Sequence, residues 1–215
     1  MTLIGHSEKV LVMRVFIIVL VLIFSLQSWT KADDIRDFQI EGISIGDSLL
    51  DYALEKEIKE QMVTDYNSTT YSRYTLRRIY SKNFELYDDI QIHFKTKDKN
   101  YIIEGASGAI YNSNEFEECL ALKEEVIADT KKILPNVYNY AIKAEPWLSI
   151  DSSGKTIVSS YYFVFDRSSI YSDYIELACY DWNEDLDSSL RGTDHLKVGV
   201  NTKEFDQWLR TEAYK

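Results

Sequence analysis

Apolar residues recur at helical spacing in three segments of the chain. The first spans residues 47–62, where Asp47 or Ser48 can accept hydrogen bonds from the free amides of the first helical turn. The second spans residues 115–134 and stops before Pro135, and the third begins after Thr202. These patterns predict three helices.

Alternating apolar and polar residues, or runs rich in β-branched and aromatic residues, predict strands in the remaining sequence. The predicted strands are residues 71–80, 90–95, 101–104, 146–150, 156–166, 174–182 and 195–200. Because short polar turns connect several of them, antiparallel pairing is favoured over a doubly wound parallel sheet. The sequence therefore predicts an α+β fold, with an antiparallel sheet of about five to seven strands and about three helices mainly on one face.

The N-terminal segment has the pattern of a cleavable export signal. Arg14 precedes an apolar run over residues 15–26, and Thr30-Lys31-Ala32 follows it. This run is shorter than the roughly 20 apolar residues that a membrane-spanning helix needs. We expect the functional signal to start at Met13 and cleavage to follow Ala32. Residues 33–215 would then form a single α+β domain that is periplasmic or secreted, with no stable membrane span after cleavage.

The net charge of the chain bears on which classes of partner it can bind. Without residues 1–32 the chain keeps 21 basic and 34 acidic residues, a net charge of −13. Such a negative field disfavours nucleic acid and anionic membranes as partners. A protein or small-molecule ligand remains possible, and no sequence pattern of a cofactor site is present.

The two cysteines, Cys119 and Cys179, both follow the predicted cleavage point. An even pair in an exported chain most simply forms a disulfide, and both lie on apolar faces of their predicted elements. Two free buried thiols are the alternative. No Cys-x-x-Cys motif is present, which argues against redox catalysis.

The segment Ile45-Gly46-Asp47-Ser48-Leu49 resembles the nucleophile block of the GDSL (SGNH) hydrolase family. The resemblance implies a serine esterase with Ser48 as nucleophile, and Asp194 and His195 would be its partners. The family's Gly-x-Asn-Asp and Asp-x-x-His blocks are absent, however. Neighbouring strand residues also point to opposite faces, which disfavours a relay through Asp194 and His195. The alternative role for Ser48 is a helix N-cap.

A candidate cation loop carries Asp181, Asn183, Asp185 and Asp187 at every second position. Calcium prefers such oxygen ligands, but Leu186 and Gly192 occupy the places where an EF-hand needs glycine and a carboxylate. A solvated acidic loop is the alternative. After cleavage only two histidines remain, His93 and His195, and they form no zinc-type cluster.

Tyrosine is abundant, with 16 copies. Aromatic side chains provide rigid contact area on binding surfaces, so Tyr161, Phe163 and Phe165 are candidates for an exposed aromatic platform. Ordinary packing within the sheet is the alternative.

Several segments together resemble an uncharacterised family of small exported proteins of marine alphaproteobacteria. They are residues 38–52, Glu118-Cys119-Leu120, Cys179-Tyr180-Asp181-Trp182, residues 194–198 and residues 202–209. The resemblance implies export and a Cys119 to Cys179 bridge, but no activity. The leading hypothesis is a binding or interaction protein without chemistry of its own, and the alternative is a serine esterase using Ser48.

Overall fold

The computed structural model describes residues 34–60, 62–63, 74–79, 85–111, 116–186 and 192–213. The predicted export signal lies outside these residues. The elements are a 3₁₀ helix Ile35–Asp37, β1 Gln39–Ile40, β2 Ile43–Ser44, a 3₁₀ helix Leu49–Asp51, α2 Glu55–Glu60, β3 Met62–Val63, β4 Tyr74–Ile79, β5 Asp89–Lys95, β6 Ile103–Ile110, α3 Phe116–Ile133, β7 Tyr138–Pro146, β8 Ile157–Val164, β9 Tyr174–Asp181, β10 His195–Asn201 and α4 Lys203–Thr211.

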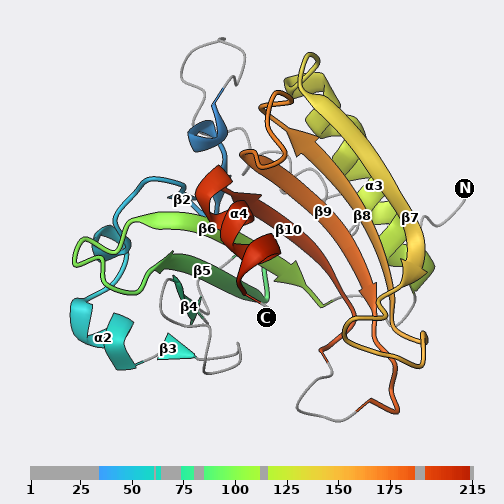
Figure 1. Cartoon of the computed structure of the whole chain (residues 1–215), viewed down its shortest axis with the longest axis horizontal. Coiled ribbons are helices and arrows are strands. Elements are labelled where there is room, and N and C mark those ends of the chain that lie inside the picture. Colours follow the sequence, from blue (N-terminus) through green and yellow to red (C-terminus); the bar gives the residue numbers. More distant parts are fainter. Residues whose placement is uncertain are drawn as a thin grey trace, which may run out of the picture.

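The main sheet has the strand order β3-β4-β5-β6-β10-β9-β8-β7, and every neighbouring pair is antiparallel. A separate hairpin joins β1 and β2. The α+β class and the antiparallel pairing expected from the sequence are confirmed. The main sheet contains eight strands within the described residues, because β3 and β7 add two that the sequence pattern did not reveal. The sheet curves strongly along its length (Figure 1).

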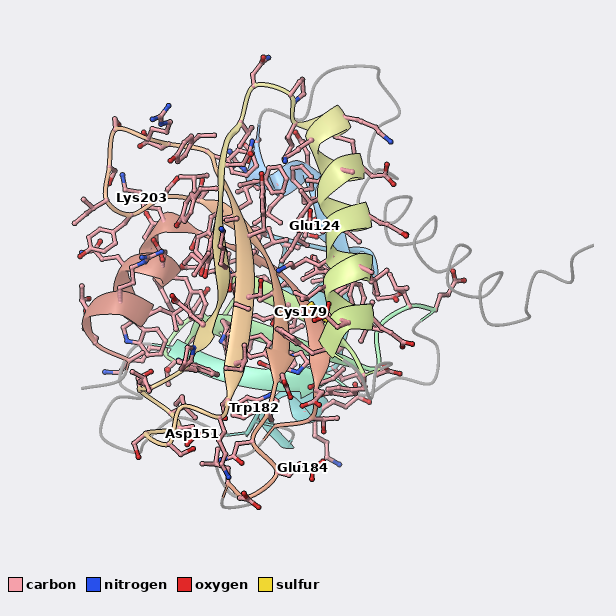
Figure 2. The ribbon with its side chains drawn as sticks, turned by 90° about the vertical axis from the view of Figure 1, so that its right-hand side faces the viewer. Glu124, Asp151, Cys179, Trp182, Glu184 and Lys203 are labelled. Carbon is pink, nitrogen blue, oxygen red and sulfur yellow. A yellow bond between two sulfur atoms is a disulfide. The ribbon has the colours of Figure 1, made fainter. Side chains whose placement is uncertain are left out.

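Strand alternation divides the main sheet into two faces. The α3 face carries Leu177 and Cys179, and the α4 face carries Glu176, Tyr180 and Lys197. The helices α3 and α4 lie on opposite sides of the sheet (Figures 1 and 2). Ile58 of α2 belongs to the same core as α3, whereas α4 packs on the other face. The apolar stripe of α4 indicates that it packs against the sheet but not against which side.

The main hydrophobic core lies on the α3 face. Its centre contains side chains of four strands and of α3 that are fully or almost fully buried, among them Ile92, Ala106, Leu177, Val198 and Val126. The N-terminal segment adds Phe38 and Ile40 to the same core. Burial of apolar surface on this face supplies the main driving force for folding.

The α4 face holds a smaller cluster of Phe205, Trp208 and Ala213. Thr202 caps α4 by accepting a hydrogen bond from the Phe205 amide, as predicted. The Phe205 ring stacks on His93 with ring centroids 4.4 Å apart. A Cβ atom on Gly105 would lie 2.9 Å from this ring, so only glycine lets α4 approach β6 so closely.

Cys119 of α3 and Cys179 of β9 form a disulfide, with an S–S distance of 2.04 Å and Cα atoms 5.9 Å apart. The predicted pairing is confirmed, and free buried thiols are excluded. The bond holds α3 against the centre of the sheet (Figure 2). Structural disulfides are typical of oxidising compartments outside the cytoplasm.

The predicted continuous helix over residues 47–62 is wrong. The chain instead forms a 3₁₀ helix at Leu49–Asp51, the short helix α2 and strand β3. The cause is a tie to the β5–β6 connection, because Ser48 forms an isolated bridge with Ile102 and the Leu49 amide donates to the Tyr101 carbonyl. This pairing fixes an extended backbone where the helix was expected to start.

The predicted strand at residues 146–150 is a turn, closed by hydrogen bonds from the Ile150 and Asp151 amides to the Trp147 carbonyl. Pro146 is instead the last residue of edge strand β7. An edge strand tolerates proline because one side of its backbone needs no ladder partner.

Candidate functional site

Ser48 serves as a helix cap. Its hydroxyl accepts a hydrogen bond from the Leu50 amide at 3.2 Å and donates one to the Asn100 carbonyl at 2.5 Å. The residue pairs with Ile102, just before β6, whereas His195 begins β10 beside the far end of β6. The eight residues of β6, at about 3.3 Å each, separate the two by roughly 25 Å. The structure does not bring Ser48 and His195 together.

The third member of the predicted esterase relay, Asp194, is engaged elsewhere. Its carboxylate accepts a hydrogen bond from the Trp182 amide at 2.7 Å. It thereby ties the end of β9 to the segment that precedes β10. This contact is structural and does not position the imidazole of His195 toward a nucleophile.

Polar side chains of the candidate cation loop bind other residues of the protein. The Asn183 amide nitrogen donates to Asp151 at 3.1 Å, and Asp185 forms an ion pair with Lys155 at 2.7 Å. Burial and the nearby carboxylates of Asp194 and Glu184 raise the pKa of Asp181. Asp187 lies outside the described residues. Among the residues that the structure describes, no group of three or more His, Cys, Asp or Glu is placed to hold a metal ion.

The predicted aromatic platform faces the core. Phe163 is fully buried, Tyr161 is 8% exposed, and Phe165 is partly buried and packs edge-on against Phe38. The expectation of an exposed surface at these three residues was wrong. The alternate residues of the same strand, including Tyr162, lie on the α4 face instead.

A cavity of about 420 Å³ opens on the α4 face, and we call it the aromatic cavity. Its lining combines five aromatic rings with a few polar side chains, and the main members are Gln91, Ser107, Tyr111, Trp147, Tyr180, Trp182, Thr193, His195 and Lys197. Most of them lie on strands β5, β6, β9 and β10. Tyr111 follows β6, Trp147 follows β7, and Trp182 and Thr193 lie between β9 and β10 in the sequence. Its volume lies within the range of small-molecule sites.

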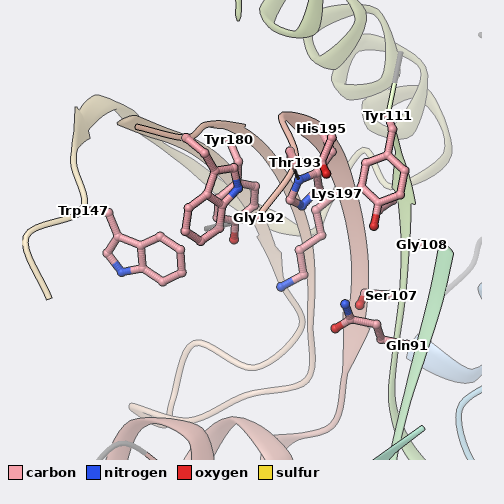
Figure 3. Close-up of a pocket in the computed structure, with 12 residues that line it drawn as sticks. Gln91, Ser107, Gly108, Tyr111, Trp147, Tyr180, Gly192, Thr193, His195 and Lys197 are labelled. Atoms are coloured by element: carbon pink, nitrogen blue, oxygen red, sulfur yellow. Dashed lines mark hydrogen bonds between the residues drawn. The ribbon is translucent and has the colours of Figure 1, made fainter. Parts of the chain in front are cut away.

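One wall of the aromatic cavity is a row of parallel rings. Tyr180 lies between His195, with centroids 4.6 Å apart, and Trp182, at 6.1 Å. Trp147 is tilted by 53° and 56° from the Tyr180 and Trp182 rings, at 5.6 and 5.5 Å. Trp147 therefore does not join the row and stands on the opposite side of the cavity from Tyr111 (Figure 3).

An ion pair lies beneath the aromatic cavity. The Lys197 ammonium donates to Glu176 at 2.8 Å, and the Tyr162 hydroxyl donates to the other oxygen of the same carboxylate at 2.8 Å. Burial alone would raise the pKa of Glu176, but Lys197 and these hydrogen bonds hold it below its usual value. Burial alone would lower the pKa of Lys197, yet Glu176 keeps it well above its usual value. Both groups remain charged near neutral pH.

His195 is neutral near pH 7, because burial lowers its pKa. Its Nδ1 lies 2.6 Å from the Thr193 carbonyl oxygen. Since a carbonyl only accepts, Nδ1 carries the proton and Nε2 is the acceptor nitrogen.

Asp151 fixes the mouth of the aromatic cavity. This buried carboxylate accepts hydrogen bonds from the amides of Ser153 and Thr156, each at 2.9 Å, and from the Asn183 side chain. It thereby joins the turn that carries Trp147 to the segment that carries Trp182, and the two regions meet at the same end of the sheet (Figure 2). The hydrogen bonds from Ser153 and Thr156 hold the pKa of Asp151 well below its usual value.

A second cavity of about 320 Å³ lies on the α4 face beside α4. Tyr138, Tyr140, Tyr162 and Tyr174 line it, together with Arg210 and other residues. Tyr140 stacks on Tyr162 with centroids 5.2 Å apart. Tyr138, Tyr140 and Tyr162 thus lie on the face of the sheet opposite to the one that carries Tyr161 and Phe163.

A buried serine–lysine pair lies on the α3 face. The Lys123 ammonium donates to the Ser159 hydroxyl at 2.6 Å and to the Ser159 carbonyl at 3.0 Å. Such a pair can act as nucleophile and base when substrate reaches it. Lys123 is 3% exposed and Ser159 is 6% exposed, and neither lines the two cavities described above. The pair therefore supports packing of α3 on the sheet.

Sequence reasoning missed most of the aromatic cavity, including Trp147, Tyr180 and Lys197, and also Glu176, the ion-pair partner of Lys197. One signal was available, because Glu176 interrupts an otherwise apolar and aromatic strand. A carboxylate at a central strand position requires a partner or a function. The partner, Lys197, lies 21 residues further along the chain, and its identity depends on strand order.

No family model, curated protein or solved structure matches this chain. No helix in the described part of the chain is long and apolar enough to cross a membrane.

Proposed function

We propose that this protein is an exported binding protein that holds a small ligand in the aromatic cavity and performs no chemistry on it. The observation that carries the proposal is the cavity itself, where rings from distant segments surround a space of about 420 Å³ above a partly buried ion pair. Concave sites with aromatic walls and a few fixed polar groups are typical of ligand binding.

The electrostatics favour binding over acid–base catalysis. A general acid or base works best when its pKa lies near the working pH. Glu176 and Lys197 have pKa values displaced away from neutrality in opposite directions, so neither exchanges a proton readily near pH 7. Ser48 lies at the other end of β6 from His195 and has a role as a cap, which lowers support for the esterase alternative.

Two features support export. The N-terminal residues 13–32 have the pattern of a signal peptide. The disulfide between Cys119 and Cys179 also fits an oxidising compartment. Expression of the full chain in a bacterial host, followed by fractionation and N-terminal sequencing, tests this part. We expect oxidised protein in the periplasm or medium that begins at Asp33, whereas retention in the cytoplasm would contradict it.

Binding is tested with a small-molecule fragment library on the oxidised protein, followed by tryptophan fluorescence and nuclear magnetic resonance. We expect hits that perturb Trp147 and Trp182, and their affinity should fall by about tenfold or more in Trp147→Ala. Leu148→Ala is the matched control, because Leu148 is the exposed neighbour of Trp147 on the same turn and does not line the cavity. Hits that are indifferent to Trp147 would contradict the proposal.

The esterase alternative has its own test. Chromogenic esters of short and medium acyl chains are incubated with the wild-type protein and with Ser48→Ala. We expect no hydrolysis that depends on Ser48, and a loss of stability of about 1 kcal/mol in the variant as the only effect. Ester hydrolysis by the wild type that Ser48→Ala abolishes would support the serine esterase alternative and overturn the binding proposal.

A further inference from the structure

The polar groups of the aromatic cavity are mostly neutral. Gln91 of β5 offers an amide, and Ser107 of β6 and Thr193 offer hydroxyl groups. Lys197 extends its ammonium into the space between these residues and Trp147 (Figure 3). A ligand that uses these groups must itself carry several hydrogen-bonding groups along one side.

The charges around the cavity do not favour strongly charged ligands. The Lys197 ammonium is neutralised by Glu176 at 2.8 Å, and His195 is neutral near pH 7. The Lys197–Glu176 pair has no net charge, so it offers no free carboxylate to hold a cation. An anion would meet the field of a chain whose net charge is −11, without an uncompensated positive group to hold it. The cavity thus suits an uncharged ligand.

The aromatic geometry specifies the shape of such a ligand. Trp147 packs obliquely against Tyr180 and Trp182, yet it lines the cavity and is only partly buried, so part of its ring faces the space across from the polar residues (Figure 3). A pyranose ring has an apolar face of C–H groups and a rim of hydroxyl groups. Its face can pack on an indole while its rim hydrogen-bonds to amide, hydroxyl and ammonium groups on the other side.

We infer that the ligand of the aromatic cavity is an uncharged carbohydrate, whose ring face packs on Trp147 and whose hydroxyl groups bond to Gln91, Ser107 and Lys197. This inference rests on the proposed binding function and adds the class of ligand. A purely apolar aromatic compound fits less well, since it would displace water from these polar groups and leave them unpaired.

The test exposes the full, oxidised chain to an array of neutral oligosaccharides of hexoses and pentoses. The same protein is tested against uronic-acid and sulfated oligosaccharides, indole and quaternary ammonium compounds. We expect binding to one or more neutral oligosaccharides, confirmed by calorimetry. Because no net charge is involved, the dissociation constant should change less than about twofold between 50 and 500 mM salt.

Variants locate the binding. Trp147→Ala and Gln91→Ala should each weaken the neutral oligosaccharide by about tenfold or more, and Leu148→Ala should leave it unchanged. Circular dichroism of each variant establishes that it is folded. Trp147→Phe, which keeps an aromatic face, should retain part of the affinity lost in Trp147→Ala.

The outcomes separate the two proposals. Binding of charged sugars, indole or a quaternary ammonium compound in a Trp147-dependent way, with no neutral sugar bound, overturns the carbohydrate inference and leaves the binding function standing. Failure of the whole array together with a fragment library that gives no Trp147-dependent hit overturns both. Neutral sugar binding that is insensitive to Trp147 and Gln91 also overturns the inference, because the sugar would then occupy another place.

Discussion

Replacing Lys197 by methionine leaves the Glu176 carboxylate on the α4 face without its ammonium partner. Breaking a fully buried ion pair costs about 3–5 kcal/mol, because the remaining charge stays desolvated. Here the Glu176 side chain is 10% exposed and the Lys197 side chain is 29% exposed, so water reaches one end of the pair. We therefore expect Lys197→Met to lower the free energy of unfolding by about 2–3 kcal/mol at pH 7.

The assay is urea unfolding followed by far-ultraviolet circular dichroism at 25 °C. A double variant, Glu176→Gln with Lys197→Met, removes both charges while Tyr162 keeps a hydrogen-bonding partner. It should recover most of the loss, since no charge remains buried. The slope of the unfolding free energy against urea should stay unchanged in both variants, because the fold and the buried area are preserved.

Acid provides a second check on the same pair. In the wild type the pKa of Glu176 is lowered on folding, so its stabilising contribution is present above the unfolded pKa and is lost as pH falls through the folded pKa. In Lys197→Met the isolated carboxyl takes up a proton more readily, so the stability gap between variant and wild type should narrow as pH falls from 7 to 4. A single variant as stable as the wild type at pH 7, or a double variant as damaged as the single one, would refute the reasoning.

Three further predictions concern residues that hold the structure around the cavity in place. Replacing Cys119 and Cys179 by alanine opens a loop of 60 residues and should cost about 4 kcal/mol in denaturant unfolding, and the reduced wild type should show a similar loss. Asp151→Asn should destabilise the protein at pH 5, and its deficit in melting temperature should shrink below pH 3.8, because a carboxyl whose pKa is lowered on folding loses its contribution as it protonates. Gly108→Ala places a Cβ atom 2.3 Å from the Tyr87 ring and should lower the free energy of unfolding by about 1–3 kcal/mol. Gly199→Ala is the control and should be nearly neutral, because its nearest contact is at 3.5 Å. Equal melting temperatures for the two variants would contradict the packing argument.

Much of the fold could be predicted from local patterns. The strand at 174–182 and the helix at 115–134 emerge from apolar periodicity, because burial of one face imposes that period. Thr202 and Ser48 act as caps, as their side chains and positions indicate. The disulfide followed from cysteine count, the expected compartment and inward-facing positions.

Other features depended on contacts between distant segments. Alternation separates Tyr161 from Tyr162 but does not say which of them faces the core; Tyr161 does, so the alternative of ordinary sheet packing is confirmed. The helix expected from residue 47 fails because Ser48 pairs with Ile102, a contact that no local pattern reports. Propensity is overridden wherever tertiary pairing satisfies the backbone better.

The aromatic cavity was the least predictable feature. Its lining includes Trp147, Tyr180 and His195, which are brought together only by the order β10-β9-β8-β7 and by the turn that Asp151 holds. The one signal in the sequence was Glu176, a charged residue in the middle of a predicted strand near this cavity. The remainder required the sheet order, which hairpin patterns alone do not determine.

Cys179 and Tyr180 are consecutive, so one residue is cross-linked to α3 while the next forms part of the cavity wall on the other face. The wall is thereby ordered before any ligand arrives. Under the proposed binding function, a ligand would meet a surface that has already lost its conformational freedom during folding, and binding would incur little further entropic cost. Reduction of the disulfide would leave the wall more mobile, and ligand binding would then have to order it. The same cavity would therefore bind its ligand more weakly in a reducing environment, even if the chain stayed folded.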